Sequence, residues 1–153
     1  MKLYLMQHGK PLSKDEDPER PLSDQGAMEL RKMAEFLEKC GIRVGEVLHS
    51  GKTRARQTAE IMISKLNPGA EPVGKDYLSP LDDVKDIGDQ IKEREDDLMI
   101  AGHLPHLSKL TSLLVTGSES TPVVAYQQGG VVCLSRDKDG NWTVAWMLVP
   151  EII

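Results

Sequence analysis

The sequence has few of the features that mark secreted, membrane-spanning or metal-binding proteins. Its two cysteines, Cys40 and Cys133, lie far apart and show no Cys-x-x-Cys or Cys/His ligand spacing, which indicates reduced, packed thiols. The apolar stretch near the amino terminus, Leu3 to Met6, is too short for a signal-peptide core, and no run approaches membrane-spanning length. We therefore expect a cytoplasmic protein that has no membrane partner.

Basic blocks are also missing. The chain has 19 Lys and Arg residues against 24 Asp and Glu residues, which gives a net charge of -5, and no basic run is long enough to follow a phosphodiester backbone. We therefore expect no nucleic-acid partner. A length of 153 residues suffices for one domain that buries a core without disulfide or metal staples. The expected organisation is a single domain over residues 1–153.

Strand-like and helix-like segments alternate along most of the chain. This alternation predicts a three-layer α/β domain with a mainly parallel central sheet flanked by helices. Strands are expected at residues 3–6, 46–49 and 97–101, with a weak candidate at 72–73. Helices are expected from Ser23 to just beyond Cys40, at 53–66, at 82–95, and from Pro105 onward. Two further strands, 131–136 and 142–148, flank the turn 137–140 and predict a C-terminal antiparallel hairpin.

Three strands are followed directly by polar residues and then by a helix. These strand ends carry His8, Arg54 and His103, and parallel neighbouring strands would bring the three side chains into one crevice. Gly9 would let the backbone approach an anionic ligand closely. A guanidinium grips an anion bidentately, and a neutral imidazole is a competent nucleophile toward phosphorus. The sequence therefore predicts a site that handles a phosphoryl group.

Four segments resemble motifs of the histidine phosphatase superfamily, and more narrowly of its small SixA-type phosphohistidine phosphatases. In chain order they are Gln7-His8-Gly9, Arg20-Pro21-Leu22-Ser23-Asp24-Gln25-Gly26, Ser50-Gly51-Lys52-Thr53-Arg54-Ala55-Arg56-Gln57-Thr58 and His103-Leu104-Pro105. The resemblance covers nearly the whole chain. It implies a phosphoglycerate mutase-like fold.

The resemblance also implies roles for individual residues. His8 would be the nucleophile that becomes phosphorylated, and Arg54 and His103 would bind the phosphoryl oxygens. Arg20 would be a further phosphate ligand reaching in from its loop. The family needs no metal or other cofactor, and no carboxylate cluster with magnesium-like spacing accompanies the histidines.

The chain departs from the family at position 7, where Gln7 replaces an arginine. Glutamine can donate hydrogen bonds to phosphate, but it has neither the charge nor the fork of a guanidinium. Losing one electrostatic donor costs a rate factor on the order of 10² to 10³ unless another group compensates. Lys10, two residues after His8, is a candidate for that compensation; a solvated loop lysine is the alternative interpretation.

Two further residues have competing interpretations. Asp83 lies where larger relatives have an acid that protonates the leaving group, but it could instead begin the next helix, where a carboxylate is favourable. His106 follows His103 by three residues, a spacing compatible with a metal pair, but no third ligand is identifiable.

The expected function is metal-independent hydrolysis of phosphohistidine on proteins through a phosphorylated His8, with inorganic phosphate as the product. The resemblance to the compact SixA type, whose short connections leave an open, shallow site, implies a phosphorylated protein as the substrate partner. The chain lacks room for the large lid-like insertions of sugar-phosphate mutases, which disfavours a mutase. Two alternatives stay open. One is a phosphatase of small phosphorylated molecules that uses the same residues, and the other is a non-catalytic phosphate- or phosphoprotein-binding module weakened by Gln7.

Overall fold

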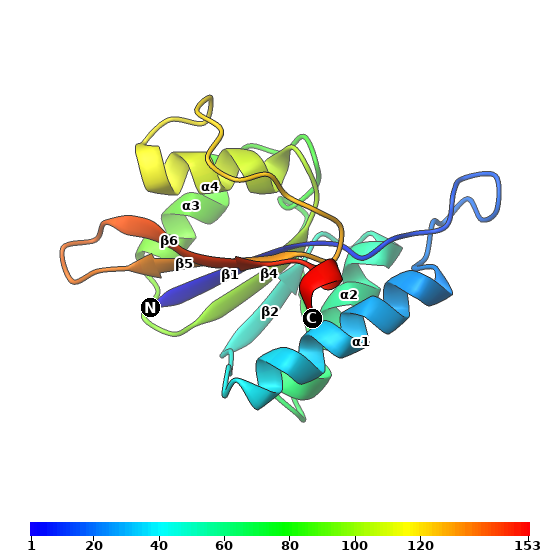
Figure 1. The fold of residues 1–153 in the computed structure, drawn as a ribbon. Coiled ribbons are helices and arrows are strands. Elements are labelled where there is room, and N and C mark those ends of the chain that lie inside the picture. Colours follow the sequence, from blue (N-terminus) through cyan, green and yellow to red (C-terminus); the bar gives the residue numbers. More distant parts are fainter.

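The computed structural model describes residues 1–153 and contains one six-stranded sheet between two helical layers (Figure 1). The strand order is β3-β2-β4-β1-β5-β6. The strands are β1 (Lys2–Gln7), β2 (Glu46–His49), β3 (Val73–Gly74), β4 (Leu98–Gly102), β5 (Val131–Arg136) and β6 (Trp142–Leu148). The first four run parallel to one another, whereas β5 and β6 add antiparallel strands at one edge. The predicted α/β class, mainly parallel sheet and C-terminal hairpin are therefore confirmed.

Helices α1 (Asp24–Lys39) and α2 (Thr53–Leu66) cover one face of the sheet, and α3 (Val84–Lys92) and α4 (His106–Thr116) cover the other (Figure 1). Strand β1 shows how the sequence supports both layers. Tyr4 and Met6 pack in the core beneath α1 and α2, while Leu3 and Leu5 pack in the core beneath α3 and α4. A strand buried on both faces reads as a continuous apolar run, because alternate side chains enter opposite cores.

Local signals determine where the two long helices begin and end. Ser23 caps α1 by accepting a hydrogen bond from the amide of Gly26, and Gly41 ends the helix region with a positive φ of 77°. Helix α2 spans the predicted residues 53–66. None of the helices combines the length and apolar character needed to cross a bilayer.

Helix α3 is shorter than the predicted range of 82–95. Asp83 caps its amino end, so the helix begins one residue later, at Val84. At its carboxyl end, the Arg136 guanidinium donates hydrogen bonds to the carbonyl oxygens of Ile91, Lys92 and Arg94. An arginine far along the sequence therefore satisfies the last carbonyls of the helix. The short 3₁₀ helix η1 (Pro150–Ile152) was not predicted.

Candidate active site

His8 follows β1 at the carboxyl end of the parallel strands. Its backbone amide donates to the carbonyl of Gly102, 3.0 Å away, which continues the pairing of β1 with β4. The ring nitrogen Nδ1 lies 2.8 Å from the carbonyl oxygen of Gly9. Because a carbonyl can only accept a hydrogen bond, Nδ1 carries the proton. In the neutral ring, the lone pair is therefore on Nε2, the atom that faces the site.

Arg54, in the first turn of α2, contacts Nε2 of His8. Its Nε donates to Nε2 of His8 across 3.2 Å. Strands β2 and β1 are parallel and end at the same edge of the sheet. Because β2 ends at His49 and α2 begins at Thr53, the guanidinium of Arg54 lies at this edge. The contact fixes the imidazole with its lone pair directed toward a cation that can also bind an anion.

His103 follows β4, the strand between β1 and β2. Its ring centroid lies 5.1 Å from that of His8, with the ring planes inclined at 56°. Its Nε2 shares a 2.5 Å hydrogen bond with Oγ of Ser50, while its Nδ1 is buried and has no partner. The structure therefore brings His8, Arg54 and His103 together, as the strand order predicts.

Both imidazoles are held in the neutral form. Burial lowers the pKa of His8 to about 4, and the charges of Arg54 and Arg20 act in the same direction, against an opposing hydrogen bond to Gly9. Burial lowers the pKa of His103 to about 3, with further lowering from His8, Arg54 and Lys52. At neutral pH the Nε2 lone pair of His8 is therefore not protonated; it accepts the hydrogen bond from Arg54 and is free to attack once that N–H turns away. The positive charge of the site comes from side chains other than the histidines.

Arg20 reaches the site from the loop between β1 and α1. This loop folds back on itself through a bridge between Pro11 and Leu22, and the amide of Leu12 donates to the carbonyl of Pro21. Arg20 adopts a positive φ of 47°, and its Nε donates to the carbonyl of Leu12. Arg20 and Arg54 line the same depression. Burial lowers the pKa of both His8 and Arg54, and the charge of Arg20 lowers each further.

An open depression of about 400 Å³ adjoins these groups. Pro18 is the single apolar residue in its lining, and four of its residues are basic: Lys14, Arg20, Lys52 and Arg54. Glu19 is the single acidic residue in the lining. In a protein whose net charge is -5, this is a local concentration of positive charge suited to an anion.

Gly9 has a structural role that differs from the predicted one. Its amide donates to Oγ1 of Thr58, 3.1 Å away, so it is not free to bind a phosphate oxygen. A Cβ at position 9 would lie 2.6 Å from Cδ1 of Leu30 in the core. The glycine is therefore required by tight packing under the loop, and its carbonyl fixes the His8 tautomer.

Gln7 lies beside the site but makes no compensating contact there. It is opposite Gly102 in the β1–β4 register, and its side-chain oxygen is buried without a hydrogen-bond partner. Lys10 does not supply the charge either, because its exposed ammonium donates to Oε1 of Gln25 on α1. The Lys10 ammonium is therefore engaged by Gln25, and no hydrogen bond joins it to either imidazole.

Asp83 adopts the second of its two predicted roles. Its carboxylate accepts the amide of Lys85 and caps α3. His106 lies at the start of α4 and is 1% exposed, with neither ring nitrogen hydrogen-bonded. The structure gathers no group of three metal-ligating side chains around it.

Sequence reasoning assigned no role to Ser50 or Thr58, which support the two histidines. Ser50 bonds His103, and Thr58 links Gly9 to α2 by accepting the Gly9 amide and donating to the carbonyl of Arg54. Both residues lie within the segment 50–58 that carries Arg54, and that proximity was the available signal. Their partners are distant in sequence, so the contacts themselves could not be read from spacing.

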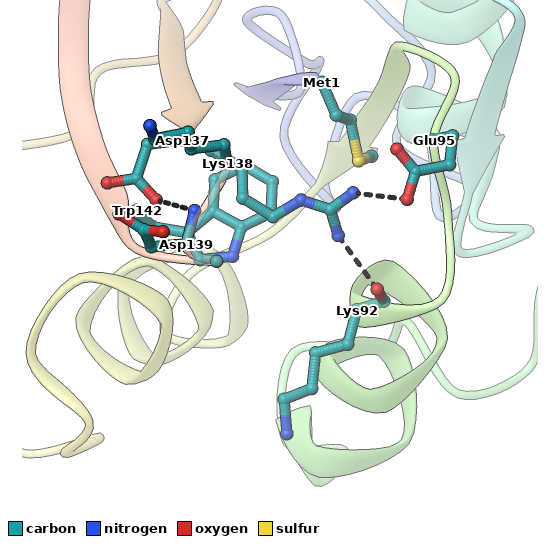
Figure 2. A pocket seen from close by; sticks show the side chains of 9 residues that line it. Met1, Lys92, Glu95, Asp137, Lys138, Asp139 and Trp142 are labelled. Carbon is teal, nitrogen blue, oxygen red and sulfur yellow. Dashed lines mark hydrogen bonds and ion pairs between the residues drawn. The ribbon is translucent and has the colours of Figure 1, made fainter.

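A second depression, of about 520 Å³, lies at the other end of the molecule, near Met1 and the β5–β6 turn (Figure 2). Its central arginine, Arg136, bonds Glu95 and the end of α3, and its guanidinium carbon lies 5.7 Å from the ring centre of Trp142. These contacts join α3 to the hairpin. These contacts account for the shape of the depression, and its lining includes no His, Cys, Ser or Thr.

A neutral imidazole that faces guanidinium groups at the open end of a parallel sheet defines a phosphoryl-transfer protein. The family model of the histidine phosphatase superfamily (branch 1) matches residues 3–82, and the chain belongs to that superfamily. It is a hydrolase of the phosphatase class.

Comparisons with individual proteins agree with this assignment. Phosphohistidine phosphatase SixA of Escherichia coli (strain K12) is 28% identical over 155 residues, covering 98% of this chain and 94% of the relative. A solved structure of the protein histidine phosphatase SixA complexed with tungstate has a TM-score of 0.85 at 28% identity and covers 98% and 97% of the two chains. Phosphoglycerate mutase from Plasmodium falciparum has a TM-score of 0.69 at 16% identity, covering 95% and 88%, which confirms the expected fold.

Proposed function

We propose that the protein hydrolyses phosphohistidine on other proteins through a phosphorylated His8. The observation that carries this proposal is the arrangement of the His8 ring, with Nδ1 bound to the Gly9 carbonyl and Nε2 facing Arg54. That arrangement leaves one nitrogen as nucleophile and places a cation where the phosphoryl group must arrive. The similarity to a SixA phosphatase supports the choice of phosphohistidine as substrate.

In the first step, the Arg54 Nε–H turns from Nε2 of His8 to a phosphoryl oxygen, and the freed Nε2 lone pair attacks the phosphorus atom of the substrate. A nitrogen–phosphorus bond forms on His8 while the substrate's own nitrogen–phosphorus bond breaks. The bonding electron pair stays on the departing imidazole, which takes up a proton from water in the open site. This leaving group departs more readily than an alkoxide, so the reaction does not require a strong general acid; Asp83 is engaged in capping α3.

In the second step, a water molecule attacks the phosphorus of phosphorylated His8. The nitrogen–phosphorus bond breaks, its electron pair returns to Nε2, and inorganic phosphate leaves. Arg54, Arg20 and His103 surround the oxygens that carry charge during both steps. Their contribution is electrostatic stabilisation, the principal source of catalysis in phosphoryl transfer.

The shape of the site supports a protein substrate. The depression lined by Arg20 and Arg54 is open, and its lining is polar or charged apart from Pro18. A third depression, open and of about 540 Å³, is lined by Ser50 and by residues that include Gly74, Lys75 and Tyr77. A histidine on a folded protein could enter such a site without a lid closing over it. The cytoplasmic location expected from the sequence stays a prediction.

The test is to trap the intermediate. Wild type, His8→Ala and the control His106→Leu are incubated with a protein that carries labelled phosphohistidine, and the reactions are quenched in alkali. We expect acid-labile label on wild type and on His106→Leu, and none on His8→Ala. Absence of both label and hydrolysis, together with saturable tungstate binding, would contradict the proposal and favour a binding module. Faster turnover of small phosphate esters would instead favour the small-molecule alternative.

A further inference from the structure

We propose that the ammonium group of Lys52 supplies the positive charge that Gln7 does not provide, on the side of the phosphoryl site formed by His103. This inference rests on the proposed function, because it concerns the binding of the transferred phosphoryl group. It makes Lys52 a catalytic residue that contacts a phosphoryl oxygen. The role is specific to a chain that has glutamine before the nucleophilic histidine.

The position of Gln7 shows where charge is missing. Gln7 is opposite Gly102 in the pairing of β1 with β4, and Gly102 immediately precedes His103. The register therefore places position 7 next to the strand that leads into His103. The Gln7 side-chain oxygen is buried without a partner, and an amide carries no charge to offset a dianion.

The backbone places Lys52 next to the same histidine. Lys52 is the N-cap residue of α2, and its backbone amide donates to Oγ of Ser50. Ser50 in turn shares a hydrogen bond with Nε2 of His103. The Lys52 side chain is exposed and lines the same depression as Arg20 and Arg54, without an ion-pair partner.

Different sets of cations lower the pKa of the two imidazoles. After burial, the charges that lower the pKa of His8 are those of Arg54 and Arg20. For His103, burial, His8 and Arg54 are followed by Lys52 as causes of the lowered pKa. Arg54 therefore acts on both imidazoles, Arg20 on His8 and Lys52 on His103, and all three cations line one depression.

A lysine at position 52 can supply the positive charge of an arginine but not its bidentate geometry. Its ammonium is a compact point charge on a flexible stem, so it can reach a phosphoryl oxygen from an exposed position but cannot form a bidentate fork. Exposure also allows salt to screen the charge. We therefore expect an effect on the order of tenfold, smaller than the factor of 10² to 10³ of a preorganised buried donor.

The experiment is a double-mutant cycle between positions 7 and 52. Wild type, Lys52→Met, Gln7→Arg and the double variant are compared in kcat for phosphohistidine protein and in affinity for tungstate. Lys10→Met serves as the matched control, because that ammonium is bound to Gln25. Lys52→Arg, which keeps the charge, tests for rescue.

In the wild-type background, we expect Lys52→Met to lower both kcat and tungstate affinity about tenfold, and Lys52→Arg and Lys10→Met to change either by less than about threefold. In the Gln7→Arg background, the loss caused by Lys52→Met should shrink to less than about threefold. Equal losses in both backgrounds, or equal effects of Lys52→Met and Lys10→Met, would overturn the inference. If the wild type lacks turnover, the proposed function fails, and tungstate affinity alone then decides the role of Lys52.

Discussion

Nε of Arg54 donates a hydrogen bond to Nε2 of His8 across 3.2 Å, so the nucleophile and its principal cation are already in contact before a substrate arrives. The same guanidinium must then turn part of its donor fork to the phosphoryl oxygens. Because only arginine has this planar fork, Arg54→Lys should lower kcat by a factor on the order of 10² even though it keeps the charge. Steady-state kinetics with phosphohistidine protein measure the effect.

The control for this variant is Arg56→Lys. Arg56 lies two residues further along α2, with its side chain 52% exposed and 3.8 Å from Glu60. We expect its replacement to leave kcat within about twofold, because exposed ion pairs of this kind contribute little. Similar losses for the two variants would show that the helix, rather than the Arg54–His8 contact, is what matters.

Ser50 is expected to orient His103, since its hydroxyl is the hydrogen-bond partner of that ring. Ser50→Ala should lower kcat about tenfold with a smaller change in KM, because the loss affects orientation in the transition state. Ser64→Ala is the control: this serine bonds the Ile61 carbonyl on an exposed part of α2. An unchanged kcat in Ser50→Ala would contradict the orienting role.

The protonation of His8 can be followed directly by nitrogen NMR of the imidazole. Burial lowers its pKa to about 4, so between about pH 8 and pH 5 the ring should stay neutral, with the proton on Nδ1. The lone pair of Nε2 then remains available throughout this range. A titration midpoint near the ordinary value of 6.5, or a proton on Nε2, would contradict the geometry described for the nucleophile.

His106 should make folding sensitive to acid. Burial lowers its pKa from the ordinary value of 6.5, opposed by the nearby charges of Asp82 and Asp83 and aided by that of Lys109. The unfolded chain then binds a proton more readily, so this histidine's contribution to stability is complete above pH 6.5 and is lost as the pH falls below that value. Its contribution to the pH slope is at most about 1.4 kcal/mol per pH unit.

Urea unfolding of wild type and His106→Leu at about pH 7 and pH 5 measures this effect. We expect the free energy of unfolding to fall less in His106→Leu than in wild type over this interval. The other histidines with lowered pKa, including His49, remain in both proteins and cancel between them. Parallel losses in the two proteins would show that His106 does not titrate with unfolding.

Much of the fold could be predicted because local signals agree with the tertiary structure. The continuous apolar residues of β1 and β4 indicate strands buried on both faces, and Ser23 and Gly41 mark the limits of the first helix. The end of α3 could not be predicted in the same way. It depends on Arg136, which lies more than forty residues further along the chain and bonds the last carbonyls of the helix.

The site was predictable to a similar extent. The strand ends identify His8, Arg54 and His103, because parallel neighbours present their carboxyl ends at one edge. The direction of a long flexible side chain is not encoded in spacing, and so Lys10 was a reasonable candidate that the structure places against Gln25. Likewise, position 9 must be glycine because a Cβ there would collide with Leu30 in the core. Leu30 is distant in sequence, so spacing could not reveal this contact.

The sharpest test of the proposed mechanism is to identify the phosphorylated residue. Wild-type protein is mixed with phosphohistidine protein, quenched in alkali within the first turnover, digested, and mapped by mass spectrometry. We expect a phosphoryl group on the Nε2 nitrogen of His8, appearing before free phosphate and disappearing as phosphate is released. Hydrolysis without any phosphorylated His8, or with the phosphoryl group on another residue, would contradict the mechanism.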